Sequence, residues 1–191
     1  MLNKRVRFIH PMLAREVFTP FSDDHWIYEI KWNGHRAIAD LDRDKILLYS
    51  RKSQPFNLTF PTVVEALREL NLNVVLDGEI VAMDDRGRSS FQLLQQYGKQ
   101  PGIHLQYQVF DLLYKDGQSL EKEPLLWRKS LLRDILRTGE IIRYTDHIRE
   151  KGVQLFQKAM VAQWEGIMGK KIDSPYREGL RSADWVKIKM H

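Results

Sequence analysis

One short run of the sequence contains a lysine whose neighbours could prepare it for covalent chemistry. It extends from Glu29 to Arg36 with the sequence EIKWNGHR, and Lys31 is its third residue. A neutral lysine amine is a nucleophile, but an ordinary lysine is protonated, with a pKa of about 10.4. Nearby cations favour the neutral form. Taken alone, a lysine beside an Asn-Gly pair is more often a solvated surface residue. The interpretation of Lys31 as a nucleophile therefore depends on segments nearer the C-terminus.

Five further segments rich in charged or aromatic residues come after it in order. They are Ser50-Arg51, LDGEI from Leu76 to Ile80, VFD from Val109 to Asp111, EGIMGK from Glu165 to Lys170, and WVKIK from Trp185 to Lys189. A single lysine motif is a weak signal, but a lysine followed by five such segments is a much stronger one.

With these segments the chain resembles the ATP-dependent DNA ligases and their relatives, the RNA ligases and mRNA capping enzymes. The run from Lys31 to Arg36 is similar to their Lys-x-Asp-Gly-x-Arg signature. The stretch 173–182 and the segment PMLA from Pro11 to Ala14 resemble bacterial end-joining ligases more than capping enzymes. The resemblance covers nearly the whole chain and identifies it with the adenylation (nucleotidyltransferase) domain.

The resemblance implies a reaction in three steps. Lys31 attacks the α-phosphate of ATP and forms a covalent lysyl-AMP. The AMP then passes to the 5′-phosphate of a DNA strand, and attack by the adjacent 3′-hydroxyl seals the nick. The implied partner is nicked double-stranded DNA, with repair or end-joining proteins as further partners.

The resemblance also implies which cations assist Lys31. Lys187 and Lys189 alternate with apolar residues, so both ammonium groups should leave the same face of a strand. An exposed edge strand shows the same alternation. By resemblance, both lysines are catalytic and bind phosphate, and Glu165 binds Mg²⁺ or Mn²⁺, although an acidic residue before a strand is more often a surface residue. These cations would favour the neutral lysine and offset charge on the phosphates.

The remaining roles implied by the resemblance concern the nucleotide. Glu29 would recognise the adenine amino group, Arg36 and Glu79 the ribose, Arg51 a phosphate, and Phe110 would stack on the base. Asp77 and Asp111 would support the site.

Two of these assignments have plain structural alternatives. Asp77-Gly78 has the composition of a hairpin turn, and a single phenylalanine such as Phe110 is usually core.

Hydrophobic periodicity predicts an α+β fold, because the strands and helices do not strictly alternate. Strands are predicted at 25–31, 36–42, 45–50, 73–83, 103–113, 141–144, 166–171 and 184–189, and helices at 60–70, 123–136 and 150–162. The pair Asn33-Gly34 predicts a tight hairpin between the first two strands. The resemblance implies two packed, mainly antiparallel sheets flanked by helices, an ATP-grasp-like core with a nucleotide cleft between the sheets.

Composition fits a basic protein with a polyanionic partner. The net charge is +5 and the sequence pI is about 9.4, although a solvated basic surface explains the charge equally well. The chain has no cysteine, which excludes disulfides and thiolate zinc sites. No apolar run is long enough to span a bilayer, and Met1 to His10 lacks the apolar core of a secretion signal. We therefore expect a monomeric cytoplasmic protein without membrane contact.

The sequence departs from the family pattern at two places. Asn33 stands where the signature has aspartate, which removes a negative charge near the lysine. The sequence ends at His191, whereas the resemblance implies a following OB-fold domain, so we expect residues 1–191 to form a single adenylation domain without it. An RNA ligase, a GTP-dependent capping-type enzyme and a non-catalytic nucleic-acid-binding module remain alternatives.

Overall fold

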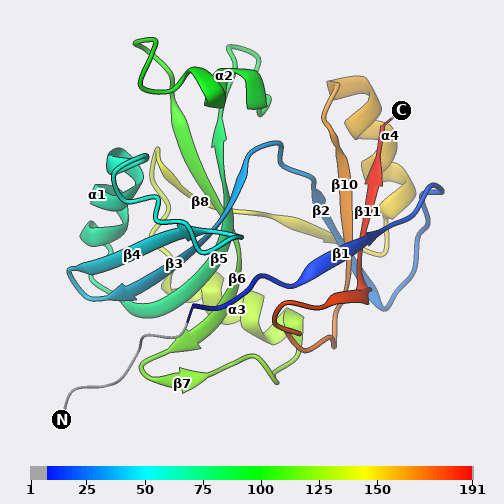
Figure 1. Cartoon of the computed structure of the whole chain (residues 1–191). Coiled ribbons are helices and arrows are strands. Elements are labelled where there is room, and N and C mark those ends of the chain that lie inside the picture. The colour runs from blue at the N-terminus through cyan, green and yellow to red at the C-terminus, as the bar shows by residue number, and fades with distance from the viewer. Residues whose placement is uncertain (1–7, 191) are drawn as a thin grey trace.

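Two β-sheets stand beside each other at the centre of the molecule (Figure 1), which a computed structural model describes from residue 8 to residue 190. The first, sheet A, has the strand order β1-β11-β10-β2-β9, and only its β1–β11 pair is parallel. Its strands are β1 (Leu13–Glu16), β2 (Trp26–Ile30), β9 (His147–Arg149), β10 (Gly166–Lys171) and β11 (Arg181–Lys189).

The second sheet, sheet B, has the order β4-β3-β5-β6-β7, all antiparallel, and β8 adds to β6 in parallel. Its strands are β3 (His35–Asp42), β4 (Lys45–Ser50), β5 (Asn73–Ala82), β6 (Leu105–Lys115), β7 (Gln118–Ser119) and β8 (Ile142–Tyr144). The predicted fold class, two mainly antiparallel sheets with helices around them, is confirmed.

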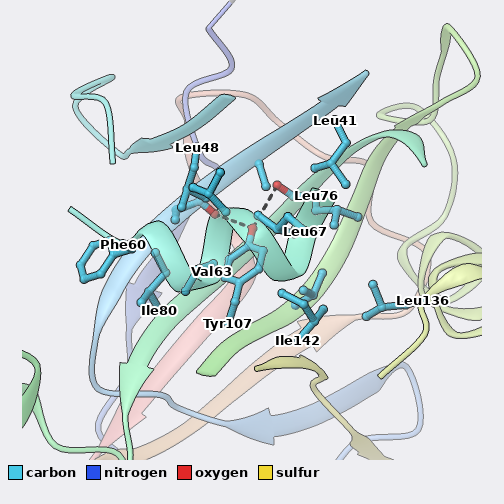
Figure 2. Close-up of a cluster of buried hydrophobic side chains, with 14 of the residues drawn as sticks. Leu41, Leu48, Phe60, Val63, Leu67, Leu76, Ile80, Tyr107, Leu136 and Ile142 are labelled. Atoms are coloured by element: carbon cyan, nitrogen blue, oxygen red, sulfur yellow. Dashed lines mark hydrogen bonds between the residues drawn. The ribbon is translucent and has the colours of Figure 1, made fainter. Parts of the chain in front are cut away.

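Four helices complete the fold. They are α1 (Pro61–Glu69), α2 (Phe91–Gln96), α3 (Leu125–Ile135) and α4 (Gly152–Ala162). Helix α1 packs its buried residues Val63 and Leu67 into the main core of sheet B. Figure 2 shows this core around Tyr107, whose hydroxyl lies 3.0 and 3.4 Å from the carbonyl oxygens of Ala37 and Leu76. Helix α4 covers the opposite side of the molecule and packs on sheet A.

A second core lies between the sheets and joins them. It contains Ile27 of β2 and Trp185 of β11 from sheet A, with Ile38, Val75 and Phe110 from sheet B. Their immediate neighbours point the other way; Ala37 and Ala39, for example, belong to the outer core of sheet B. Alternation along each strand therefore gives each sheet one face toward its helices and one toward the other sheet.

The predicted hairpin at Asn33-Gly34 is wrong. Strands β2 and β3 belong to different sheets, and residues 31–34 cross from one to the other. Gly34 is needed there for close approach, since a Cβ on it would lie 2.1 Å from the carbonyl oxygen of Ile80. The alternative of a turn at Asp77-Gly78 is also wrong, because β5 continues through both residues, with a shift of its register against β6 between them. Long-range packing has overridden local turn propensity at both dipeptides.

Most other predicted elements are confirmed within a few residues at their ends. Strands β1, β7 and β9 and helix α2 were not predicted, and β11 begins at Arg181 rather than at 184. Strands β1 and β9 form by pairing with partners distant in the chain, β11 and β2, so no local pattern marks them. Strand β7 instead pairs with the neighbouring β6 across the turn at Asp116-Gly117. Within residues 8–190, no helix is long and apolar enough to cross a membrane. The N-terminal segment up to Arg7 and the terminal His191, both used in the sequence predictions, lie outside the described residues.

Candidate active site

Strand alternation turns most of the predicted site residues toward one cleft of about 240 Å³ between the sheets. Sheet A contributes residues two apart along its strands, such as Met168 and Lys170 on β10, or Trp185 and Lys187 on β11. Seven predicted residues line the cleft: Glu29, Lys31, Arg36, Arg51, Glu79, Phe110 and Lys187. Glu165 and Lys189 do not line it, but Glu165 pairs with Lys31, and Lys189 shares a carboxylate partner with Lys187.

Lys31 begins the crossing between the sheets and is held at both its backbone and its side chain. Its N–H donates to the carbonyl of Gly166 at 3.0 Å, and its Nζ lies 2.5 Å from Oε1 of Glu165. The second carboxylate oxygen, Oε2 of Glu165, is buried and has no hydrogen-bond partner among the described residues. An oxygen ligand of this kind suits a hard divalent cation such as Mg²⁺, so the donor present fits the predicted metal.

Lys187 and Lys189 leave the same face of β11, as predicted. Both ammonium groups reach one carboxylate oxygen, Oε2 of Glu16 on β1, at 3.1 and 3.3 Å. These two lysines lower the pKa of Glu16. Glu16 was not singled out from the sequence, because its role depends on the parallel pairing of β1 with β11.

Arg36 lies against the wall of the cleft formed by sheet B. Its Nε and Nη2 donate to the two carboxylate oxygens of Asp77, each at 2.6 Å. The guanidinium carbon lies 4.6 Å from the centre of the Phe110 ring. Asp77 is completely buried, and this charge raises the pKa of Arg36 although burial opposes it. The guanidinium is therefore a fixed cation in the cleft.

Glu79, two residues beyond Asp77 on β5, faces the same cleft. Burial raises its pKa to about 7, and the charges of Arg36 and Lys31 only partly offset this effect. A carboxyl group in this state exchanges its proton near neutral pH. Glu79 can therefore donate or accept a hydrogen bond in the cleft.

Glu29 lines the end of the cleft next to Lys170 and is only 1% exposed. Its two carboxylate oxygens each lie 2.6 Å from a buried ammonium group, those of Lys129 and Lys170. Burial alone would raise the pKa of Glu29, but the two lysines outweigh it and the pKa is lowered. The Lys170 ammonium also lies 4.2 Å from the Phe110 ring centre and 4.3 Å from that of Trp185. This end of the cleft thus combines an aromatic wall with a buried ionic cluster.

Arg51 extends the site toward the surface. It follows β4, is exposed, and lines both the cleft and a second, more open hollow of about 520 Å³. The two hollows also share Arg36 and Glu79, and Lys52 lines the outer one. A basic surface therefore leads out of the cleft on the side of sheet B.

Sequence reasoning missed the two basic residues that α3 buries. Arg128 and Lys129 are completely buried, on the same helix face as Leu125 and Leu132. Lys129 donates to the carbonyls of Phe110 and Thr145, and it pairs with Glu29. Charged residues on a helix usually face solvent. The available signal was their spacing, since positions three, four and seven after Leu125 form one face.

Comparison with known proteins gives one consistent family. The family model described as ATP dependent DNA ligase domain matches residues 1–189. The chain is 31% identical over 183 residues to the prophage-derived DNA ligase-like protein LigB of Bacillus subtilis, covering 95% of this chain and 67% of that protein. It is 31% identical over 190 residues to the multifunctional non-homologous end joining protein LigD of Mycolicibacterium smegmatis.

Comparison with solved structures points to the same family. The structure matches a mycobacterial DNA ligase D complexed with ATP and MES with a TM-score of 0.84 at 30% identity, over 95% of this chain and 60% of that one. The match with the Mycolicibacterium protein covers 98% of this chain but only 24% of the relative. The chain therefore corresponds to one part of these longer proteins.

Proposed function

This chain belongs to the family of ATP-dependent DNA ligase domains, and from that premise we propose that it is the adenylation domain of a DNA-joining enzyme, with Lys31 as its nucleophile. The observation that carries the proposal is the cleft between the sheets. It brings Lys31, Glu79 and Lys187 together from three separate strands or connections. The family match favours DNA joining over the RNA-ligase and capping alternatives.

In the first step, the neutral amine of Lys31 attacks the α-phosphorus of ATP. A bond forms between Nζ and phosphorus while the bond from phosphorus to the pyrophosphate oxygen breaks. Pyrophosphate leaves, and the nitrogen releases one proton to give lysyl-AMP. Lys187 and Lys189 lie on one strand face and would offset the charge that develops on the phosphate oxygens.

Glu165 would control the charge state of Lys31. While it pairs with the ammonium at 2.5 Å, it favours the protonated amine, which is no nucleophile. The unpartnered Oε2 of Glu165 would hold Mg²⁺ or Mn²⁺, and the bound cation would supply positive charge that weakens this pair and polarises phosphate oxygens. Asn33 adds no carboxylate beside the lysine.

The remaining residues would hold the nucleotide. Glu79 and Arg36 would bind the ribose, and Phe110 the base, which an aromatic face suits. Glu29 still has lone pairs to accept from the adenine amino group, although two lysines already pair with it.

Arg51 would bind a phosphate of the nucleotide, and the outer hollow beside it would bind phosphates of the DNA strand. Transfer of AMP to a DNA 5′-phosphate and closure of the nick by the 3′-hydroxyl would follow, with nicked double-stranded DNA as the substrate. Repair or end-joining proteins would be its partners.

The intact mass of the purified chain, measured before and after incubation with Mg²⁺ and ATP, GTP or NAD⁺, tests the first step. We expect the mass of one AMP to be gained from ATP alone, or to be present already, and to be absent in Lys31→Ala. Lys45→Ala is the matched control, because Lys45 is an exposed lysine at the start of β4. An adduct that persists in Lys31→Ala would exclude Lys31 as the nucleophile. A Lys31-dependent adduct formed from GTP instead would select the capping-type alternative.

A further inference from the structure

Four residues from four different segments close a ring of hydrogen bonds behind the cleft. Arg36 of β3 donates to Asp77 of β5. The Tyr176 hydroxyl donates to Oδ2 of Asp77 at 2.6 Å and accepts the N–H of Met12 at 3.0 Å. Nη2 of Arg36 lies 3.4 Å from the carbonyl oxygen of Met12, which completes the ring.

Tyr176 lies in the connection between β10 and β11 and is itself fixed on several sides. Its N–H donates to the carbonyl of Glu121 at 2.7 Å, and its ring meets Trp185 edge-on at a centroid distance of 5.8 Å. The side chain is 5% exposed. The hydroxyl therefore has a well-defined position, and through it sheet A constrains a carboxylate of sheet B.

This constraint matters because the two 2.6 Å hydrogen bonds to Asp77 hold the Arg36 guanidinium more tightly than the 3.4 Å contact of Nη2 with Met12. The bidentate pair uses Nε and Nη2, and Nη1 has no hydrogen bond among the described residues. Arg36 lines the cleft, so Nη1 is the group left for a ligand. A buried carboxylate with a third donor has fewer orientations than one held by its counter-ion alone.

We infer that Tyr176 is a positioning residue: its hydroxyl fixes the Asp77 carboxylate so that Arg36 presents its free edge to the ribose hydroxyls of ATP. The inference rests on the proposed function and assigns Tyr176 a task within it. Tyr176 acts only through Asp77 and Arg36, and it does not line the cleft.

The test is Tyr176→Phe, which removes the hydroxyl and keeps the ring. Two quantities are measured for ATP and for 2′,3′-dideoxy-ATP: the rate of lysyl-AMP formation at several nucleotide concentrations, and equilibrium binding. For ATP, we expect the rate constant divided by the half-saturating concentration to fall about tenfold, as for loss of a hydrogen bond to a charged group. For the dideoxy nucleotide this ratio should change little, so the variant should lose most of the wild-type preference for ATP.

Tyr49→Phe is the matched control. Its hydroxyl is also buried and also accepts an N–H from the N-terminal segment, that of Ile9 at 2.9 Å, but it makes no hydrogen bond with Asp77. It should keep the wild-type preference for ATP. Combining Tyr176→Phe with Arg36→Lys should cost little more than Arg36→Lys alone, because both changes remove the same contact.

The outcomes separate the inference from the proposed function. The inference is overturned if Tyr176→Phe weakens the binding of both nucleotides equally. It is also overturned if the wild type binds both nucleotides equally well. If the wild type forms no adduct but prefers ATP in binding, and Tyr176→Phe removes that preference, the inference holds and the proposed chemistry fails.

Discussion

At the scale of the residue, Glu79 illustrates how the cleft changes the chemistry of a single carboxyl group. Its pKa is raised to about 7, mainly by burial, while two nearby cations act in the opposite direction. Such a group binds its proton in the folded protein at pH values where the unfolded chain has already released it. The folded state therefore gains stability below the ordinary value of 4.5, and this gain is lost as pH rises through about 7. The burial of Glu79 therefore reduces the stability of the protein at alkaline pH.

Glu79→Gln should remove this dependence. Relative to the wild type, the variant should gain on the order of 2 kcal/mol in the free energy of unfolding between pH 5 and pH 8, because glutamine has no proton to lose. Urea unfolding at both pH values without nucleotide measures the difference. The exposed Glu69→Gln provides the control and should follow the wild type. Parallel stability profiles for Glu79→Gln and wild type would show that Glu79 ionises normally.

At the scale of the element, the crossing from β2 to β3 depends on the absence of one side chain. A Cβ at Gly34 would lie 2.1 Å from the carbonyl oxygen of Ile80 and 2.8 Å from a methyl group of Val81. The backbone carbonyl cannot move without disturbing β5, which also carries Asp77 and Glu79. Gly34 thus allows the chain to pass between the sheets immediately after Lys31.

Gly34→Ala should therefore lower the free energy of unfolding by about 1–3 kcal/mol or more, which is the usual cost of overpacking a rigid site. Gly139→Ala is the contrasting variant, because a Cβ there meets nothing within 4 Å and Gly139 does not have a positive φ. It should be neutral or slightly stabilising. Thermal unfolding of both variants measures the difference in melting temperature, and equal melting temperatures would refute the close approach at Gly34.

Helix α3 places two basic residues in the protein interior. It buries Arg128 and Lys129 among leucines, and each finds a carboxylate, Asp111 and Glu29 respectively. The two partners lie on different sheets, Asp111 on β6 and Glu29 on β2. A helix that packs between them thus anchors residues on both sheets.

At the scale of the whole molecule, the relation between the two sheets depends on a few polar links around the cleft. Arg128 provides one of them. It binds Asp111 through two hydrogen bonds of 2.8 Å each, and its Nη1 donates to the carbonyl of Ser174 in the β10–β11 connection. The connection that carries Tyr176 is therefore held from two sides, by Arg128 and by Asp77.

Arg128→Met should lower the free energy of unfolding by about 3–5 kcal/mol, because it leaves Asp111 buried without a counter-charge. Arg133→Met on the same helix is the control. It breaks the exposed pair with Asp146 and should cost less than about 1 kcal/mol. Urea unfolding compares the two. Adding Asp111→Asn to Arg128→Met should restore part of the loss; a double variant less stable than Arg128→Met would contradict the ion-pair explanation.

The order of the charged and aromatic segments, and the side of a strand on which their residues lie, can be read from the amino-acid sequence. Lys187 and Lys189 share a face because strand side chains alternate, and this is a local property of the backbone. The same alternation places Asp77 and Glu79 on one face of β5.

Which strands share a sheet, and which charges are buried, became known from the three-dimensional structure. Local propensity favoured a hairpin at Asn33-Gly34, but pairing with distant strands assigned β2 and β3 to different sheets. Glu16, Lys129 and Tyr176 gained their contacts in the same way, from partners that are distant in the chain. Such pairings depend on packing free energy summed over the whole molecule, and no short window of sequence contains that sum.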